Sequence, residues 1–179
     1  MDRRDHQRFE ALLREHRGIV FKVAGMYARD AEDRRDLAQE ISAQLWRAFA
    51  SFDPARGRFS TWMYRIALNV AISQWRRQAG PQVAFEPLDG YALENVVGTT
   101  TIDEPDERLV MLYRFIGGLD PLHRALILLY LEDRSHAEIA EVLGISETNV
   151  ATKINRVKQR LRQQASREGL AVGANHGTR

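Results

Sequence analysis

The chain has 179 residues, with 26 basic and 24 acidic side chains, a formal net charge of +2 and no cysteine. This composition is typical of a soluble folded protein, and the lack of cysteine excludes disulfides, thiolate zinc sites and cysteine nucleophiles. The N-terminus is too polar for a signal peptide, and the longest apolar run, residues 125–131, is far shorter than the roughly 20 residues of a membrane helix. We therefore expect a cytoplasmic protein with no membrane insertion.

Charge is distributed unevenly along the chain. Residues 1–78 have a net charge of +5, residues 79–107 hold seven acids and no base, and residues 108–179 have a net charge of +4. Because the acidic stretch is also rich in proline and glycine, we interpret it as a linker between two small domains. The predicted division is a first domain at 1–78, a linker at 79–105, a second domain at 106–167 and a tail at 168–179. The alternative is one domain with a long acidic surface loop, which would be unusual in a compact fold.

The first domain has the periodicity of helices. Apolar residues recur at steps of three and four from position 8 to 27 and again from 37 to 49. Pro54 and Gly57 then interrupt the pattern, because proline lacks a backbone donor and glycine tolerates turn geometry. A third helix is expected from about Ser60. Its packing face is predicted to comprise Trp62, Ile66, Val70 and Ser73.

Capping signals predict where the helices of the second domain begin and end. Pro105 can open a helix that Gly117 and Gly118 close, and Asp120 before Pro121 is typical of an N-cap. Residues 135–138, SHAE, have the spacing of a capping box.

The stretch that follows the capping box predicts a helix-turn-helix. Gly144 takes the turn and Ser146 caps the last helix. The buried stripe of that helix is predicted to be Val150, Ile154, Val157 and Leu161. Since the strand signal is weak throughout, the predicted fold class is all-α: two small helical domains joined by a flexible acidic linker.

The outer face of the last helix favours DNA binding. Between Lys153 and Arg167 there are six basic residues and no acid, whereas residues 132–147 hold five acids and one base. Polar side chains near the start of such a helix can reach base edges in the major groove while cations hold the phosphates. The alternative is a solvated amphipathic helix, which charge alone does not exclude.

The first domain mixes aromatic and basic residues in the manner of proteins that stack unpaired bases. The members of this mixture are Phe59, Trp62, Tyr64 and Trp75, with Arg56, Arg58, Arg65, Arg76 and Arg77. Alternatives stay open for three positions: a core role for Trp62, packing of Trp75 beneath the neighbouring arginines, and a bystander role for Asn69.

Taken in order, these motifs resemble a bacterial sigma factor of the sigma-70 family, in the extracytoplasmic-function (ECF) class that retains only regions 2 and 4. The resemblance covers nearly the whole chain. It rests on residues 36–40 (DLAQE), 59–70 (FSTWMYRIALNV), 75–77 (WRR), 119–121 (LDP) with Arg124, and 135–146 (SHAEIAEVLGIS).

The resemblance implies a role for each matched position. Contacts with core RNA polymerase are expected from Asp36, Leu37, Gln39, Glu40 and Gln44. The minus-10 promoter element, including a base flipped from the non-template strand, is expected to contact Phe52, Arg58, Trp62, Arg65, Asn69, Arg76 and Arg77. The minus-35 element is expected to contact Ser146, Thr148, Asn149, Thr152, Lys153, Asn155 and Arg156. The sequence departs from the common family pattern at Ser73, at Ala151 and in the motif at 148–150, which reads Thr-Asn-Val where Gly-Thr-Val is common.

The function implied is that of an ECF sigma factor, which binds core polymerase, recognises both promoter elements and helps to open the DNA. The implied partners are core polymerase, promoter DNA and an anti-sigma factor. No cofactor or metal is expected, and the chain is not expected to be an enzyme, because its histidines lack metal spacing and it has no phosphate-binding glycine loop. Two rival hypotheses are a stand-alone operator-binding regulator and a sigma mimic that sequesters a regulator.

Overall fold

The computed structural model describes residues 3–79 and 107–167. Over these ranges the secondary structure is entirely helical, which confirms the predicted all-α class. The helices are α1 (Arg3–Tyr27), α2 (Ala31–Ala48), the short 3-10 helix η1 (Phe49–Ser51), α3 (Phe59–Ala79), α4 (Glu107–Gly117), α5 (Pro121–Leu131), α6 (His136–Leu143) and α7 (Glu147–Arg167). The expected linker beyond residue 79, the helix start at Pro105 and the tail at 168–179 lie outside the described residues.

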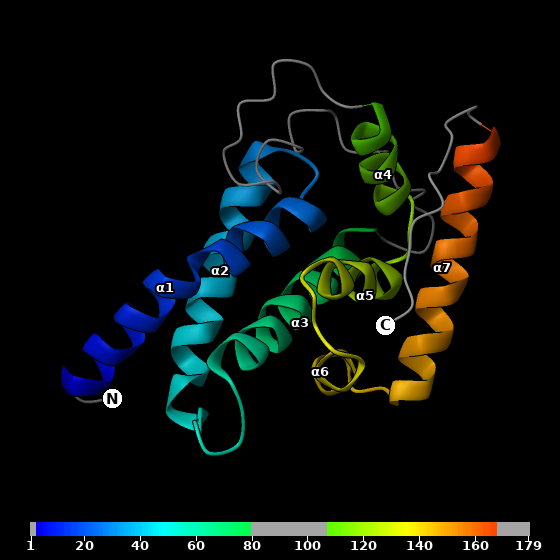
Figure 1. Ribbon diagram of the computed structural model, residues 1–179. Helices are drawn as coiled ribbons and strands as arrows, with labels where there is room; N and C mark the ends of the chain where they lie inside the picture. The colour runs from blue at the N-terminus through cyan, green and yellow to red at the C-terminus, as the bar shows by residue number, and fades with distance from the viewer. Residues whose placement is uncertain (1–2, 80–106, 168–179) are drawn as a thin grey trace.

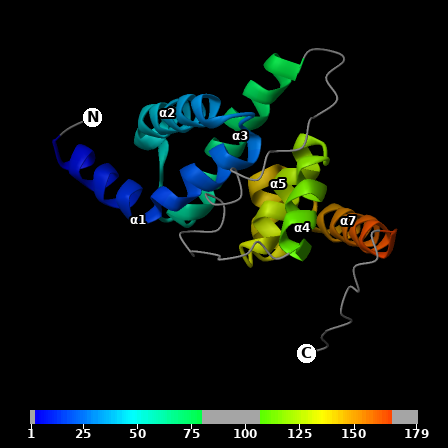
Figure 2. The ribbon, with the colours of Figure 1, turned by 90° about the horizontal axis from the view of Figure 1, so that it is seen from above.

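Helices α1, α2 and α3 pack against one another as an N-terminal bundle, and α4 to α7 form a C-terminal unit beside it (Figures 1 and 2). Helix α2 begins at an N-cap, where the Asp30 carboxylate accepts a hydrogen bond from the backbone N–H of Asp33 at 2.8 Å. From there Leu37, Ile41 and Leu45 line the buried side of α2 at steps of four residues. The cap and this spacing together account for a helix that starts sharply and faces the bundle core.

The buried face of α3 differs from the one that the sequence predicted. Its fully buried stripe is Met63, Tyr64, Ala67, Leu68 and Ala71. Trp62, Ile66 and Val70 are only half-buried at its margin, and Ser73 is exposed. The prediction was wrong because apolar residues run around most of the α3 circumference, so periodicity alone could not select the inner face.

An aromatic cluster ties the loop 52–58 to the bundle. The Phe49 ring lies at its centre, with ring centroids 5.1 Å from Phe9 and 6.3 Å from Phe59. The Phe52 ring lies 5.2 Å from Phe59 and 5.3 Å from Trp62. Edge-to-face and tilted aromatic pairs of this kind contribute about 0.5–1.5 kcal/mol each beyond the burial of their area. The loop is therefore anchored at its first residue, Phe52.

The predicted capping and turn signals of the C-terminal unit are confirmed. The Asp120 carboxylate accepts from the backbone N–H of His123, and Pro121 is the first residue of α5. Ser135 and Glu138 form the complete capping box at the start of α6. Gly144 ends α6 with a φ of 66°, in the left-handed region that only glycine adopts without strain.

The predicted inner stripe of the last helix is also confirmed. The Ser146 hydroxyl accepts from the backbone N–H of Asn149 at 3.3 Å, as expected for the cap of α7. Val150, Ile154 and Val157 are buried, and Leu161 is half-buried. Helices α6 and α7 are thus the two helices of the predicted helix-turn-helix.

The bundle and the C-terminal unit are in contact through α1 and α3 on one side and α5 and α6 on the other. Arg124 of α5 has no exposed surface, and its guanidinium donates to the Met26 carbonyl of α1 at 3.0 Å. The same guanidinium donates to the carbonyls of Gly117 at 2.7 Å and Leu119 at 3.1 Å. One buried cation therefore joins α1, α5 and the connection that follows α4.

Tyr27 reinforces this joint. Its hydroxyl donates to the Pro121 carbonyl at 2.7 Å, and its ring centroid lies 5.3 Å from the Arg124 guanidinium carbon. Burial raises the pKa of Tyr27 far above its ordinary value, so the phenol stays protonated and remains a donor.

The Glu132 carboxylate forms a second contact between the N-terminal bundle and the C-terminal unit. Glu132 follows α5 and accepts from the Lys22 ammonium of α1 at 2.6 Å and from the Tyr64 hydroxyl of α3 at 3.2 Å. Arg134 lies next to it, with its Nη1 3.3 Å from the Ser60 hydroxyl and its guanidinium carbon 5.3 Å from the Tyr64 ring centroid. The turn after α5 is thus held against both α1 and α3.

Arg124 gives the first test of this description. We expect Arg124→Met to lower the free energy of unfolding by about 3 kcal/mol, because three buried carbonyls lose a charged donor while an unbranched apolar stem still fills most of the space. Urea denaturation followed by circular dichroism measures the change, with Arg114→Met on the exposed side of α4 as the control. A loss no larger than that of the control would contradict the assigned role.

The capping box of α6 gives a pH-dependent test. The Ser135 backbone N–H lowers the pKa of the Glu138 carboxyl, helped by the Ser135 hydroxyl and Arg134. A depressed folded-state pKa stabilises the fold above the unfolded pKa of about 4.3, and the contribution disappears as the pH falls through the folded value.

We therefore expect Glu138→Gln to destabilise the protein by about 1 kcal/mol at neutral pH. The difference from the parent protein should vanish in strongly acidic solution, where Glu138 is itself neutral. Unfolding curves of both proteins across this pH range measure the effect. A difference that does not depend on pH would contradict it.

Candidate polymerase and nucleic-acid interfaces

The predicted polymerase-binding residues lie on the outer side of α2, with one exception. Asp36 and Gln39 are exposed and Glu40 is half-buried, so the three form a continuous polar surface over one helical turn. The Gln44 amide donates to the Glu40 carboxylate at 2.8 Å. Leu37 differs from the other members of the predicted set: it is 2% exposed because it packs in the bundle core, so it supports the polar surface from beneath.

The loop 52–58 forms one side of a hollow in the N-terminal bundle. Within the loop, the Asp53 carboxylate accepts from the backbone N–H of Ala55 at 2.9 Å, and the Asp53 carbonyl accepts from Arg56 N–H at 3.1 Å. These bonds fold the loop into a compact turn. Its outer side is rich in cations, because Arg56 and Arg58 are both exposed.

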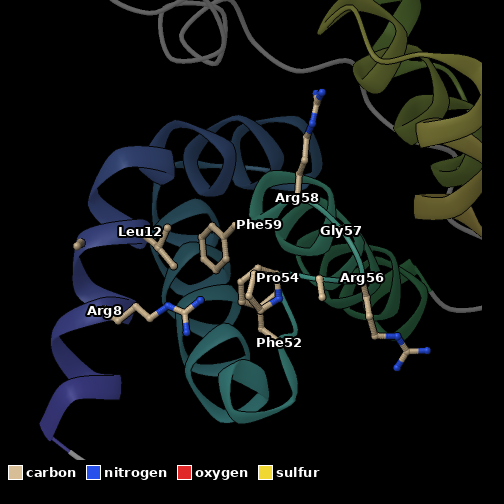
Figure 3. Close-up of a pocket in the computed structure, with 10 residues that line it drawn as sticks. Arg8, Leu12, Phe52, Pro54, Arg56, Gly57, Arg58 and Phe59 are labelled. Atoms are coloured by element: carbon tan, nitrogen blue, oxygen red, sulfur yellow. The ribbon is translucent and has the colours of Figure 1, made fainter.

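The hollow has a volume of about 760 Å³, which is within the range of small-molecule sites (Figure 3). Apolar groups of Leu12, Phe52, Pro54 and Phe59 line it. Arg8 of α1 extends toward the loop in Figure 3, whereas Arg56 and Arg58 extend away from it. An apolar surface with guanidinium groups around it suits the flat base and charged phosphate of an unpaired nucleotide.

The structure brings some of the predicted minus-10 residues together and leaves others apart. Phe52, Arg58, Trp62 and Arg65 line a second, smaller hollow on the α3 side of the same loop. Asn69 is exposed one turn beyond Arg65 on α3. Arg76 and Arg77 are exposed in the last turn of α3 and belong to neither hollow. Helical spacing nevertheless places Trp62, Arg65, Asn69 and Arg76 along one stripe.

Two aromatic residues do not belong to this exposed surface. Tyr64 has no exposed area and Phe59 only 6%, so neither can stack freely on a base as the sequence pattern suggested. Burial and the nearby Glu132 carboxylate raise the pKa of Tyr64, which keeps its hydroxyl protonated as a donor. Trp62 and Trp75 are half-buried against the core. The aromatic side chains at the surface of α3 are therefore these two tryptophans.

The predicted minus-35 residues lie together at the start and on the outer side of α7. Thr148, Asn149, Thr152, Asn155 and Arg156 are exposed, and Lys153 is half-buried. The Thr152 hydroxyl donates to the Thr148 carbonyl at 2.9 Å, and the Ser146 hydroxyl is used as the helix cap. The surface thus combines amide, hydroxyl and guanidinium groups, as direct readout of base edges requires.

One basic residue of α7 faces the protein instead of the solvent. The Lys158 ammonium lies 4.3 Å from the centroid of the Tyr130 ring of α5 and donates to the Tyr130 hydroxyl. This cation–π contact holds α7 against α5.

Sequence reasoning missed Arg8 and Leu12 of the hollow and the Glu132 joint. The spacing of Arg8 and Leu12, one helical turn apart on α1, was visible, but nothing local indicated that the loop 52–58 would close over them. Glu132 lies in an acidic segment, and its partners Lys22 and Tyr64 are far away in the chain.

Two negative findings concern the part of the chain that the structure describes. In residues 3–79 and 107–167 there is no group of three histidine, aspartate or glutamate side chains that could hold a metal ion. Over the same residues, no helix is long and apolar enough to cross a membrane.

Two family models match this chain, one over the N-terminal bundle and one over the C-terminal unit. Residues 12–80 match the family described as sigma-70 region 2, and residues 105–161 match the family described as sigma-70 region 4.

Individual relatives extend over most of the chain. The ECF RNA polymerase sigma factor RpoE of Cereibacter sphaeroides is 29% identical over 171 residues, covering 92% of this chain and 90% of the relative. SigW of Bacillus subtilis is 26% identical, covering 89% and 90%. SigE of Mycolicibacterium smegmatis is 28% identical over 86% of this chain, which spans only 60% of that longer protein.

A solved structure shows the same fold. CnrH, in its complex with the cytosolic domain of CnrY, aligns with a TM-score of 0.65 at 23% identity, covering 90% of this chain and 89% of CnrH. The two matched families, their order along the chain and the ECF relatives agree with the helical architecture. This chain therefore belongs to the sigma-70 family of RNA polymerase sigma factors, in the ECF class, and carries regions 2 and 4.

Proposed function

We propose that this sigma factor divides its work between three surfaces: α2 binds core RNA polymerase, the loop 52–58 with α3 reads the minus-10 element, and α7 reads the minus-35 element. The observation that supports this most directly is that the polar side chains of all three surfaces face outward while their apolar neighbours form the core. The polymerase carries out RNA synthesis, and this chain selects the promoter and helps to open the DNA strands.

The polymerase contact centres on Asp36, Gln39 and Glu40. These side chains lie within one turn of α2, and the helix beneath them is fixed by Leu37, Ile41 and Leu45. A rigid helix that presents a small polar surface fits a partner helix with basic and polar groups.

Co-elution with core polymerase tests this surface. We expect the variant Asp36→Ala/Gln39→Ala/Glu40→Ala to lose co-elution on size-exclusion chromatography, because the polar contacts are removed while the helix is retained. The matched control is Gln7→Ala/Glu10→Ala/Glu15→Ala, which likewise removes two carboxylates and one amide, from exposed positions of α1. Retention of binding by the first variant, or equal loss in both, would contradict the assignment.

The minus-10 function uses the two hollows beside the loop 52–58. Extrusion of a base from the duplex costs a few kcal/mol, which stacking and edge hydrogen bonds in a protein pocket offset. Phe52 provides aromatic surface to both hollows and Trp62 to the smaller one, while Arg8, Arg58 and Arg65 provide charge for the backbone. We assign the larger hollow, which is lined mainly by apolar side chains, to the flipped base of the non-template strand.

The minus-35 function uses the N-terminal half of α7. Asn155 and Arg156 carry the side chains best suited to paired hydrogen bonds with adenine and guanine edges. The helix is held by its cap, by the turn at Gly144 and by the inner stripe of Val150 and Ile154. Recognition is therefore built on a rigid element, as specific readout requires.

Sequence preference of the holoenzyme tests the α7 assignment. We expect Asn155→Ala/Arg156→Ala to relax the preference at the minus-35 element, with a cost of about 1–3 kcal/mol for each lost base contact. Selection of promoter fragments from a randomised pool by holoenzymes containing each variant measures the change. Arg162→Ala, an exposed position further along α7, is the control. An unaltered minus-35 preference in the double variant would contradict the proposal.

The remaining features of the function follow from this role. The chain acts in the cytoplasm, where the polymerase is, and has no catalytic site of its own. Its functional domains are residues 1–78 and 106–167, connected by 79–105 and followed by a tail at 168–179. An anti-sigma factor that covers the polymerase-binding surface regulates it, in keeping with the ECF class.

A further inference from the structure

The C-terminal end of α3 carries Arg76 and Arg77, but the hydrophobic core holds this end only weakly. Beyond Ala71, none of the α3 side chains that the structure describes is fully buried. Arg76 and Arg77 are exposed, and Trp75 before them is half-buried at the margin of the core. A helix end with few buried contacts frays readily, because its last carbonyls have no intrahelical partner. A fixed direction for the two arginines therefore needs a further contact.

The carboxylate of Asp33, in the first turn of α2, makes such a contact. Its Oδ1 accepts from the side-chain amide of Gln78 at 3.0 Å and from that of Gln74 at 3.3 Å. Its Oδ2 accepts from the backbone N–H of Arg29 at 3.1 Å and from the Arg29 guanidinium at 3.2 Å. The Asp33 side chain is only 10% exposed. One carboxylate therefore joins the turn between α1 and α2 to the end of α3.

Asp33 is suited to this bridge because it is ionised. Burial opposes ionisation, but the hydrogen bonds from Gln78 and Arg29 outweigh it, so the pKa of the Asp33 carboxyl lies below its ordinary value. An ionised carboxylate accepts only and has enough lone pairs for all four donors. An acid in the first turn also stabilises α2 through the helix dipole, a role that the exposed Glu32 shares. The bonds to the two glutamines of α3 go beyond that role.

The side of α3 that binds Asp33 lies opposite to Arg76. Gln74 and Gln78 are one turn apart and both reach Asp33, so they lie on the side of α3 that faces α2. With 3.6 residues per turn, Arg76 projects from the opposite side and Arg77 from an adjoining one. Arg76 there continues the exposed stripe of α3 that is proposed to read the minus-10 element. The bridge thus anchors the back of the helix whose front carries the arginines.

We propose that Asp33 is a positioning residue for promoter binding: through Gln74 and Gln78 it fixes the end of α3, so that Arg76 and Arg77 are already ordered when they meet the DNA backbone. Order that exists before binding does not have to be created during it, and the affinity is higher by that amount. Asp33 acts through α3 and is not assigned a contact with DNA. This inference rests on the minus-10 role proposed for the two arginines.

The sign of the effect separates positioning from simple electrostatics. Removal of an acid from a DNA-binding protein reduces its repulsion of phosphates, which by itself tightens binding. We expect Asp33→Ala to do the opposite and to raise the Kd of the holoenzyme for promoter DNA about threefold to tenfold, because the arginines must then be ordered on binding. The probe is a promoter fragment that the parent holoenzyme selects from a randomised pool, and fluorescence anisotropy at one salt concentration gives the Kd. The control Glu32→Ala removes an exposed acid from the same turn and should not raise the Kd.

A variant without any change of charge breaks the same bridge from the side of α3. Gln74→Ala/Gln78→Ala keeps the helix propensity of α3, since alanine is the best helix former, and should raise the Kd by a similar factor. In combination with Asp33→Ala it should add little, because both changes remove one interaction. Fully additive effects would mean that the glutamines act independently of Asp33 and would overturn the inference. A Kd for Asp33→Ala that is unchanged or lower would also overturn it.

Two further measurements separate this inference from a general structural role and from the proposed function. Asp33→Ala should still co-elute with core polymerase, and loss of co-elution would overturn the inference, because the residue would then support the whole bundle. Arg76→Ala/Arg77→Ala should raise the Kd and make Asp33→Ala silent in its background, since nothing is left to position. If the arginine variant has the parent Kd, the minus-10 role proposed for these residues fails and the inference fails with it. If the arginine variant raises the Kd but Asp33→Ala adds its full effect to it, the inference alone fails.

Discussion

The buried guanidinium of Arg124 is the constraint on which the relative placement of the helices depends. A charge that is removed from water must keep its hydrogen-bond partners, since the loss of even one leaves a large desolvation cost without compensation. The partners of Arg124 come from the end of α1, from the last residue of α4 and from the connection between α4 and α5. These three places must therefore stay in register, and the direction in which α5 leaves this joint determines where α6 and α7 can lie.

The rest of the molecule follows from the division of each helix into an inner and an outer side. The inner sides of α2, α3 and α7 are lined by aliphatic residues at helical spacing and fix the rotation of each helix about its axis. Because the core fixes each helix, the residues on its outer side point in a definite direction and need no core contacts of their own to do so. A protein that must bind a large enzyme and two stretches of DNA can in this way change its recognition residues while keeping its core.

Much of this architecture could be predicted from local sequence. The N-cap at Asp120, the capping box at Ser135 and the turn at Gly144 are determined by neighbouring residues, so the helix-turn-helix was legible without a structure. The inner face of α3 was not, because apolar residues almost encircle that helix and its partners on α1, α2, α5 and α6 select which of them are buried.

The same reason explains why two residues of the predicted surfaces are buried. Leu37 and Tyr64 stand within motifs rich in polar or aromatic surface residues, yet both are buried by helices distant in sequence. Glu132 and Arg8 acquire their importance only when segments far apart in the chain meet. Local rules thus predicted where elements begin and end, whereas the pairing of faces and the membership of the hollows depended on tertiary contacts.

The position of Lys158 changes the number of basic side chains on α7 that can reach DNA. Each phosphate that a protein neutralises releases condensed counterions, and the dependence of DNA affinity on salt reflects the number of cations that reach the backbone. Lys158 is held over the Tyr130 ring and is not directed toward DNA. The salt dependence of minus-35 binding should therefore be shallower than the basic composition of α7 suggests, by about 0.9 in the logarithmic slope. A residue that looks like part of an electrostatic surface belongs instead to the packing of the domain.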